Sequence, residues 1–452
     1  MELKDKTVLV FGAGISGVSA ADLLSEAGAH VVLFDSNKDA DPARILEKTR
    51  HPKSITCYLG ELPEELIKTL DLVILSPGVP TDLPVVKAFY GKGLPVWGEV
   101  ELAYRLGKGK VLAVTGTNGK TTTTALLGKI IGDYYPSVFI VGNIGNPYTD
   151  AALSLRKDSI AVAEISSFQL ETIDTFAPKV SAILNITEDH LNRHHSMEEY
   201  IRVKKLIAKN QGPEDVCVLN AEDPYLSGMD KEIRARVIWF SSERRLPEGI
   251  FLEDGRIILK TGADEEIMVA AVDELKLLGR HNYENVMAAV AMGYAAGVPM
   301  ESIQKSIKEF TAVPHRIEFV EEKNGVAYYN DSKGTNPDAA IKGIQAMNRP
   351  TFLIGGGYDK GSSYDEWIGA FDGKVKELVL IGQTREKIRD AAFRLGFTDC
   401  VLVENLQEAV AYCAGKARPG DAVLLSPACA SWGQFDNYEQ RGDLFKEYVH
   451  KL

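Results

Sequence analysis

Cysteine is scarce in this sequence, with five among 452 residues, and no two of them form a C-x-x-C pair. Such sparse, unevenly spaced thiols are typical of reduced cysteines in the cytoplasm. No run of about 18 apolar residues occurs, and the N-terminus lacks the apolar core and cleavage site of a secretion signal. We therefore expect a cytoplasmic protein without a membrane span.

Positive charge is also in deficit. Asp and Glu outnumber Lys and Arg by 63 to 51, which gives a formal net charge of −12. Nucleic-acid binding depends on basic surfaces, so this balance argues against a DNA or RNA partner. An anionic substrate therefore needs local basic groups and helix N-termini to hold it against the overall field.

No low-complexity linker or short internal repeat interrupts the chain, and three segments of strand–loop–helix alternation follow one another. This pattern predicts three successive α/β domains. The first is a Rossmann-like domain over residues 1–98. The second is a central P-loop ATPase-like domain with a mostly parallel sheet over residues 99–312. The third is a Rossmann-like domain over residues 313–452.

The most informative stretch is VLAVTGTNGKTTTTALLGKII, in which a strand pattern enters a loop bracketed by Gly116 and Gly119 and a helical pattern follows. Such a loop lets backbone N–H groups converge on phosphate oxygens, while Lys120 reaches the terminal phosphates and Thr121 ligates Mg²⁺. Val114 stands where the common form of the motif has its first glycine. The order of strand, loop and helix still predicts a nucleotide-phosphate site.

A second glycine-rich pattern, GAGISG, follows the strand pattern TVLVF near the N-terminus. Asp35 ends the next strand pattern, as expected where a nucleotide or diphosphate lies on the first helix. The motif does not identify the ligand. Later in the same segment Ser76-Pro77-Gly78 follows a buried-type strand, which fits a simple turn and a substrate-contact loop equally well.

Polar residues follow two later strand patterns of the central segment. Glu164 ends one of them, and because ligands gather at the carboxyl ends of parallel strands, it is a candidate Mg²⁺ ligand. His190 and His194 lie one helical turn apart, which raises the alternative of a zinc site. The preceding strand predicts a loop there instead of the helix of a zincin, so we favour a phosphate or Mg²⁺ contact for His190.

These motifs occur in a fixed order with others: SPG, GTNGKTT, EISSFQLE, TEDHLNRH, GRHNYENVMAA, PHRIE, NDSKGTNPDA and SPACASWGQF. In this combination the sequence resembles the Mur ligases, the ATP-dependent enzymes that build the peptide stem of bacterial cell-wall precursors. The resemblance covers essentially the whole chain. EISSFQLE and SPACAS followed by QF point to the step that joins D-glutamate to UDP-N-acetylmuramoyl-L-alanine through an acyl phosphate. Trp432-Gly433 departs from the Leu-Asp or similar pair common at that place.

The resemblance implies roles for individual residues. Those expected at ATP are Thr117, Asn118, Gly119, Lys120, Thr121, Thr122, Asn282, Asn285, Arg316 and Asp331. Those expected at two Mg²⁺ ions are Thr121, Glu164, His190 and Lys204, the last as a carbamate. The UDP substrate is expected at Gly14, Ile15, Ser16, Gly17, Asp35, Ser36, Ser76, Asn143, Ser166 and Ser167. D-Glutamate is expected at Lys333, Thr335, Lys360, Ser431 and Tyr438. The expected catalytic residues are Lys120, His190, Lys204 and Lys333.

Other interpretations stay open at this point. A nicotinamide-dependent oxidoreductase explains only the GAGISG pattern, and a kinase or nucleotide sensor explains only the phosphate loop. Another Mur ligase step or a folylpolyglutamate synthetase-like ligase shares the acyl-phosphate route but takes a different substrate. We expect a monomer.

Overall fold

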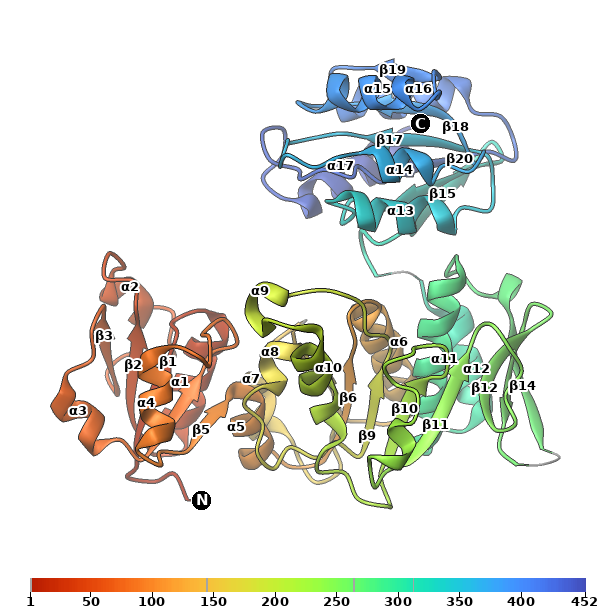
Figure 1. Cartoon of the computed structure of the whole chain (residues 1–452). Helices are drawn as coiled ribbons and strands as arrows, with labels where there is room; N and C mark the ends of the chain where they lie inside the picture. Colours follow the sequence, from red (N-terminus) through yellow and green to blue (C-terminus); the bar gives the residue numbers. More distant parts are fainter. Residues whose placement is uncertain (1, 144, 263–264, 312) are drawn as a thin grey trace. The chain divides into compact units, whose positions relative to one another are not determined.

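The structure, a computed structural model, describes residues 2–143, 145–262, 265–311 and 313–452. It contains three separate, mostly parallel β-sheets with helices packed around them, which confirms the predicted fold class (Figure 1). The first two sheets belong to one compact unit, formed by Met1–Ala271 and Glu284–Ile307, and the third belongs to a second, formed by Val272–Tyr283 and Lys308–Leu452. The predicted boundary at residue 312 lies outside the described residues.

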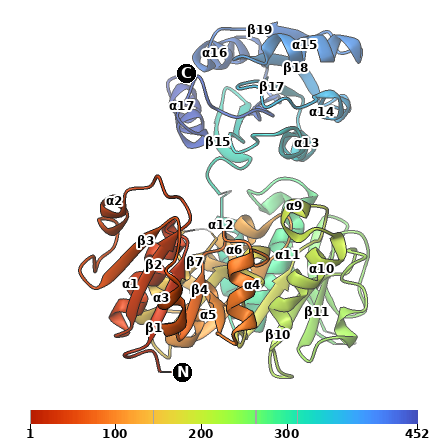
Figure 2. The same ribbon diagram turned by 60° about the vertical axis from the view of Figure 1, so that its left-hand side comes forward.

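The first sheet has five parallel strands in the order β3-β2-β1-β4-β5. Its strands are β1 (Thr7–Phe11), β2 (His30–Asp35), β3 (Ile55–Leu59), β4 (Leu72–Leu75) and β5 (Val96–Gly98). The helices of this part are α1 (Ile15–Glu26), α2 (Pro42–Leu46), α3 (Glu64–Thr69) and α4 (Pro84–Gly91) (Figure 2). The strand order runs from β1 to β3 on one side of the sheet and continues with β4 and β5 on the other side. This switch in strand order, between β1 and β4, leaves a crevice at the carboxyl ends of the strands.

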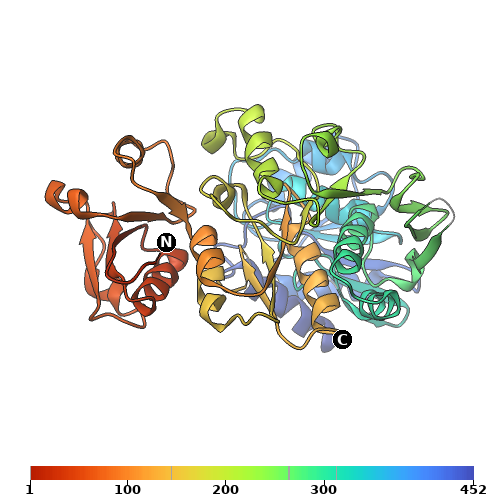
Figure 3. The same cartoon turned by 90° about the horizontal axis from the view of Figure 1, so that it is seen from below.

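The second sheet has nine strands in the order β14-β13-β12-β11-β10-β9-β6-β8-β7. They are β6 (Lys110–Thr115), β7 (Val138–Gly142), β8 (Ile160–Glu164), β9 (Val180–Ile183), β10 (Val216–Asn220), β11 (Arg236–Ser241), β12 (Gly249–Glu253), β13 (Arg256–Lys260) and β14 (Glu266–Ala271). The strands from β7 to β12 are parallel, and β12, β13 and β14 are antiparallel at one edge (Figure 3).

The helices that accompany the second sheet differ widely in length. They are α5 (Glu99–Leu106), α6 (Lys120–Gly132), α7 (Tyr148–Ala151), α8 (Ser167–Leu170), α9 (Leu191–His194), α10 (Met197–Lys205), α11 (Arg280–Ala295) and α12 (Met300–Glu309). One hydrophobic core runs without a break from the first sheet to the second, through α1, α5 and α7. It joins Val10 of β1 to Ala113 of β6, with Tyr148 buried between the helices.

The third sheet has six strands in the order β15-β16-β20-β17-β18-β19, of which only the edge strand β15 is antiparallel to its neighbour. They are β15 (Glu318–Lys323), β16 (Val326–Asn330), β17 (Thr351–Gly355), β18 (Val375–Leu380), β19 (Cys400–Leu402) and β20 (Ala422–Leu425). The helices are α13 (Pro337–Ala346), α14 (Asp365–Gly369), α15 (Arg385–Arg394), α16 (Leu406–Lys416) and α17 (Tyr438–His450). Trp367 anchors the core on one face of this sheet and Phe445 the core on the other.

Within the described part of the chain, no helix combines the length and the apolar character that crossing a membrane requires.

Candidate active site

The predicted phosphate loop connects β6 to α6 as expected. Gly116 and Gly119 have φ values of +153° and +84°, which favour glycine. A Cβ atom at Gly119 would lie 2.2 Å from Oδ1 of Asn285, so the loop also has no room for a side chain there. Lys120 Nζ donates to the carbonyl oxygens of Gly116 (3.0 Å) and Thr117 (2.8 Å), which folds the lysine back over the loop.

Glu164 ends β8, the strand beside β6, in register with Val114. Its carboxylate is buried, and Oε1 accepts a hydrogen bond of 2.7 Å from Asn143 Nδ2. The second oxygen, Oε2, is buried without a hydrogen-bond partner. Leaving a buried carboxylate oxygen unpaired is costly, and such an oxygen is the ligand type that Mg²⁺ prefers.

Lys204 of α10 is buried, although it is a lysine on an amphipathic helix. Its Nζ donates to the carbonyl oxygen of Gly116 (2.9 Å) and lies 4.8 Å from the centre of the Tyr200 ring. Burial, and then the nearby charge of Lys120, lowers the pKa of Lys204 to about 7. A buried amine therefore stands directly behind the phosphate loop.

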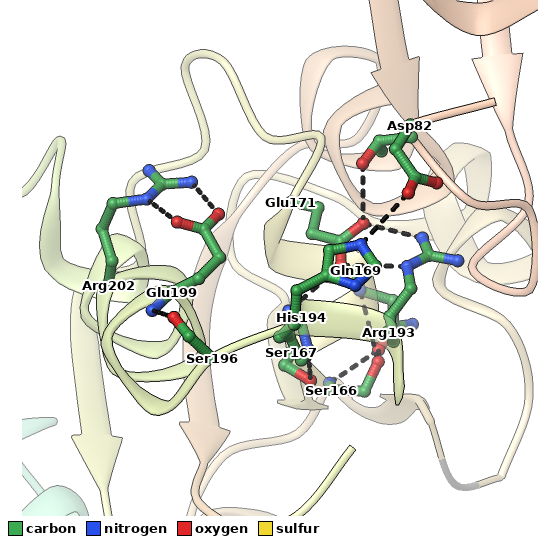
Figure 4. Close-up of polar contacts among 12 residues, drawn as sticks. Asp82, Ser166, Ser167, Gln169, Glu171, Arg193, His194, Ser196, Glu199 and Arg202 are labelled. Atoms are coloured by element: carbon green, nitrogen blue, oxygen red, sulfur yellow. Dashed lines mark hydrogen bonds and ion pairs between the residues drawn. The ribbon is translucent and has the colours of Figure 1, made fainter. Parts of the chain in front are cut away.

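His190 and His194 have different surroundings. His190 is half exposed and its ring is tilted against that of Phe168, with ring centres 4.9 Å apart. His194 is buried, with Nε2 3.0 Å from Ser167 Oγ and Nδ1 3.4 Å from Glu171 (Figure 4). Among the described residues, no three His, Cys, Asp or Glu side chains are grouped so that they could hold a metal ion.

Arg193 forms an ion pair that the sequence analysis missed, and neighbouring contacts link the histidine cluster to the segment after β4 of the first sheet. Arg193 Nη2 donates to Glu171 Oε2 (2.7 Å) and to the carbonyl oxygen of Val79 (2.9 Å). His195 Nε2 lies 3.1 Å from Asp82 Oδ2, and Asp82, like Val79, follows β4 in the chain. Arg193 and Glu171 lie inside the motifs TEDHLNRH and EISSFQLE, but only the folded chain shows that they meet.

A cavity of about 600 Å³ opens at the crevice of the first sheet, and residues after β1, β2, β4 and β7 line it together with Gln169. We call it the substrate cavity. Of the residues expected at the UDP substrate, those in its wall are Gly14, Ile15, Ser16, Asp35, Ser36, Ser76 and Asn143. The other three, Gly17, Ser166 and Ser167, do not line it. Gln169 does, although the sequence analysis did not single it out.

Asp35 and Ser76 also shape the glycine loop. Asp35 Oδ2 accepts from the backbone N–H of Ala13 (2.9 Å), and Oδ1 accepts from that of Asn37 (2.9 Å). Ser76 Oγ donates to the carbonyl oxygen of Gly12 (2.9 Å). Ser76 also stands in the cavity wall, so the Ser76 loop borders the cavity.

In the second unit, three loops meet at the carboxyl ends of the neighbouring strands β16, β20 and β17. Asp331 is buried in the first loop and accepts from Ser426 Oγ (2.7 Å), and burial raises the pKa of Asp331 to about 7. Arg441 of α17 donates to the carbonyl oxygens of Ser332 (2.7 Å) and Cys429 (3.1 Å) and so ties two of these loops together. The structural role of Arg441 was not predicted.

The residues expected at D-glutamate lie on these loops and on α17. Lys333 Nζ lies 5.2 Å from the centre of the Tyr438 ring. Lys360 Nζ lies 4.9 Å from the centre of the Trp432 ring, next to the buried Ser431. The Thr335 N–H donates to the Lys333 carbonyl oxygen (2.8 Å).

The residues expected at ATP are divided between the two units. The phosphate loop and Asn285 belong to the first unit, whereas Asn282, Arg316 and Asp331 belong to the second. Asn282 is buried and donates to the carbonyl oxygen of Leu278 (2.7 Å). Nε of Arg316 is buried without a hydrogen-bond partner.

Comparison with known proteins identifies the family to which all three segments are similar. Residues 6–98 match the Mur ligase MurD-like N-terminal domain, residues 114–293 the Mur ligase middle domain, and residues 315–429 the Mur ligase glutamate ligase domain.

Curated relatives match from end to end. The chain is 56% identical over 452 residues to the UDP-N-acetylmuramoylalanine–D-glutamate ligase of Lachnoclostridium phytofermentans, with 100% of this chain and 99% of the relative covered. It is 44% identical to the protein of the same name from Clostridioides difficile, with both chains fully covered.

Solved structures share the fold at lower identity. The UDP-N-acetylmuramate–alanine ligase MurC of Thermotoga maritima aligns with a TM-score of 0.60 at 20% identity, covering 99% of each chain. The MurF ligase of the same organism, solved in complex with ADP, aligns with a TM-score of 0.58 at 18% identity, covering 100% of this chain and 96% of the other.

Proposed function

The chain belongs to the Mur ligase family, and we propose that it joins D-glutamate to UDP-N-acetylmuramoyl-L-alanine with conversion of ATP to ADP and phosphate. The observation that carries this proposal is the end-to-end identity with relatives named for that reaction. An oxidoreductase, a kinase or a sensor is thereby set aside, because none of them needs all three segments.

The reaction requires activation of a carboxylate. A carboxylate oxygen of the L-alanyl group attacks the γ-phosphorus of ATP, the bond to ADP breaks, and an acyl phosphate forms. The D-glutamate amine then attacks the acyl carbon, loses a proton, and phosphate departs. Several anions must be brought together, so catalysis consists mainly of positioning and charge neutralisation.

The phosphate loop suits the first step. The loop of residues 117–122 is proposed to bind the phosphates, and Lys120 can exchange its contacts with the carbonyl oxygens of Gly116 and Thr117 for contacts with phosphate oxygens. The unpartnered oxygen of Glu164 and the hydroxyl of Thr121 fit one Mg²⁺, which would neutralise charge on the phosphates. His190 is proposed to hold a second Mg²⁺. Asn282, Asn285, Arg316 and Asp331 are proposed to bind the rest of ATP.

Lys204 is proposed to become a carbamate: its amine nitrogen bonds to CO₂ and a proton is released. An ammonium repels Mg²⁺, whereas a carbamate offers it a carboxylate-like oxygen. The position supports this, since Nζ is buried within 2.9 Å of the phosphate-loop carbonyl of Gly116.

The substrate cavity is proposed to take the UDP substrate. Its wall supplies the N-terminus of α1 and uncharged donors, which suit a diphosphate and a sugar. Gly17, Ser166 and Ser167, which do not line the cavity, are also proposed to act on the UDP substrate. D-Glutamate, with two carboxylates, is proposed to bind at Lys333, Thr335, Lys360, Ser431 and Tyr438. We further propose a cytoplasmic monomer.

The decisive experiment measures phosphate release from ATP and Mg²⁺ with UDP-N-acetylmuramoyl-L-alanine, with and without D-glutamate. We expect turnover only with both, and none with L-glutamate or L-lysine. Turnover with another amino acid would move the protein to a sister step. Turnover with a pterin substrate and none with a UDP-muramoyl substrate would favour a folylpolyglutamate synthetase-like ligase.

A separate experiment tests the carbamate. Lys204→Ala should lose activity, and short carboxylic acids should restore part of it by supplying the missing ligand. Full activity of the variant without any added acid would refute the proposal for Lys204 and leave the ligase assignment intact.

A further inference from the structure

We propose that Trp432 is a positioning residue for the amino-acid substrate: its indole ring is a platform that holds the Lys360 ammonium ready for a substrate carboxylate. The inference rests on the proposed function, in which Lys360 binds D-glutamate. It concerns a contact within the second unit, where Lys360 Nζ lies 4.9 Å from the centre of the Trp432 ring. Attraction between a cation and an aromatic face is effective within about 6 Å.

The backbones that carry the two side chains are fixed to each other. The loop after β17 runs beside the loop after β20: the N–H of Gly356 donates to the carbonyl oxygen of Pro427 and that of Tyr358 to the carbonyl oxygen of Ala430, both at 2.9 Å. A Cβ atom at Gly357 would lie 2.4 Å from the Ala430 carbonyl oxygen, so only glycine permits this approach. Trp432 therefore has a fixed position relative to the loop that bears Lys360.

The residues next to Lys360 are anchored as well. Asp359 accepts from the N–H of Gly361 (2.8 Å) and from Nζ of Lys387 on α15 (3.1 Å). The Tyr358 ring packs edge-on against Trp432, with ring centres 5.6 Å apart. The side chain of Lys360 itself is exposed.

Lys360 lies against an aromatic ring, whereas its neighbour Lys387 lies against a carboxylate. Lys387 is paired with Asp359, whereas no carboxylate among the described residues pairs with Lys360. A carboxylate partner would compete with an incoming anion. An aromatic face restricts the rotamers of a lysine without neutralising it, so less entropy is lost when the substrate carboxylate binds. Trp432 keeps about half of its surface exposed, which leaves the cation accessible from solvent.

The kinetic test compares Trp432→Leu with Trp432→Phe. We expect Trp432→Leu to raise KM for D-glutamate about two- to fivefold, the range of an exposed cation–π contact. The values of kcat and of KM for ATP and the UDP substrate should not change, and Trp432→Phe should stay close to wild type. Tyr412→Leu removes the ring beside Lys416 on α16 and is the matched control, with no change expected.

The double variant shows whether the effect passes through Lys360. In a Lys360→Ala background, Trp432→Leu should raise KM no further. A further rise of the same size would show that Trp432 acts independently of the lysine, and an unchanged KM in the single variant would show that it does not act at all. Either outcome overturns the proposal.

The contact between Lys360 and Trp432 can also be tested without measuring turnover, so that its failure can be distinguished from failure of the proposed function. In NMR spectra of protein with ¹³C-labelled lysine, the ε-CH₂ protons of Lys360 should be shifted upfield by the indole ring current. The shift should disappear in Trp432→Leu, and absence of the signal in Lys360→Arg assigns it. An unshifted signal in the wild type would overturn the platform even if D-glutamate is the substrate. A shifted signal in a protein inactive with D-glutamate would refute only the function.

Discussion

At the residue scale, Glu99 shows how a buried carboxyl group can orient a cavity residue. Gln169 Nε2 donates to Glu99 Oε1 (2.6 Å), which turns Gln169 Oε1 towards the N–H of Ser166 (2.8 Å). Burial raises the pKa of Glu99 to about 7, so an amide mimics its protonated form well. We expect Glu99→Leu to raise KM for the UDP substrate about 5- to 30-fold, the cost of one unsatisfied buried polar group.

Steady-state kinetics with each substrate varied in turn checks this prediction. Glu99→Gln retains an acceptor for Gln169 and should stay close to wild type. An equal rise in KM for D-glutamate would point to general disruption of the fold instead of reorientation of Gln169.

Glu101, two residues further along α5, has a structural role. Its carboxylate accepts from the N–H groups of Asp174, Thr175 and Phe176, from Thr175 Oγ1 and from Arg105 Nε. Burial alone would raise the pKa of Glu101, but these hydrogen bonds outweigh it and hold the pKa below its usual value. In Glu101→Gln the amide group faces donors whichever way it is turned. We expect a loss of about 1–3 kcal/mol in the free energy of unfolding.

The loss of stability in Glu101→Gln should depend on pH, because the pKa of Glu101 is lowered in the folded protein. Because the folded pKa is lowered, the stabilisation is complete above the ordinary glutamate value of about 4.3 and disappears as the pH falls through the folded value. Urea unfolding midpoints of wild type and variant should therefore converge on acidification below about pH 4. Glu65→Gln, at an exposed pair with Lys68, is the control and should have little effect. A difference that stays constant with pH would contradict this account.

At the scale of elements, the phosphate loop allows a test with two glycines that bracket one helix. Gly119 precedes α6 with positive φ and contacts Asn285, whereas Gly132 ends α6 with open space around it. We expect Gly119→Ala to lower turnover at least about 100-fold, since small misplacements at reacting groups have effects of this size. Gly132→Ala should leave turnover unchanged and raise stability by about 0.4–1 kcal/mol. Measurements of phosphate release and of thermal unfolding on the two variants check these predictions. Equal turnover of Gly119→Ala and Gly132→Ala would argue against a tightly packed phosphate loop.

Some elements of the fold could be predicted from the sequence and others were not. The loop at 116–119 and the strand ends at Glu164 and Asp331 were predictable because glycine spacing and buried-strand patterns are local signals. The antiparallel ribbon of β12 and β13 was not predicted, although its turn residues Asp254 and Gly255 both have positive φ and form a recognised hairpin signal. That signal was overlooked.

Other features of the site depend on contacts between distant segments. Arg193 meets Val79 across 114 positions of sequence, and Gln169 meets Glu99 across 70. No local pattern predicts such a contact, because nothing in the sequence around either partner identifies the other. The burial of Lys204 is of the same kind: its helix is amphipathic, and only the position of the phosphate loop shows which face is covered.

At the scale of the whole molecule, the distribution of hydrophobic cores predicts how the chain unfolds. The first two sheets share one continuous core that includes Trp97, whereas the third sheet has cores of its own, one of which contains Trp367. Segments that share a core unfold together, and compact units with separate cores need not. We therefore expect two transitions in urea, one for each unit.

Fluorescence can assign the two transitions. Trp97→Phe should lower the fluorescence change of one transition and Trp367→Phe that of the other, since both indoles are buried. The substrate cavity lies wholly in the first unit, so the UDP substrate alone should stabilise only the transition that Trp97 reports, by about 2.7 kcal/mol at 100 times its Kd. A single transition for both probes, or an equal shift of the Trp367 transition, would mean that the two units are energetically coupled without ATP. We expect the two units to unfold independently, because the separate cores of the third sheet can remain packed after the shared core of the first two sheets has been lost.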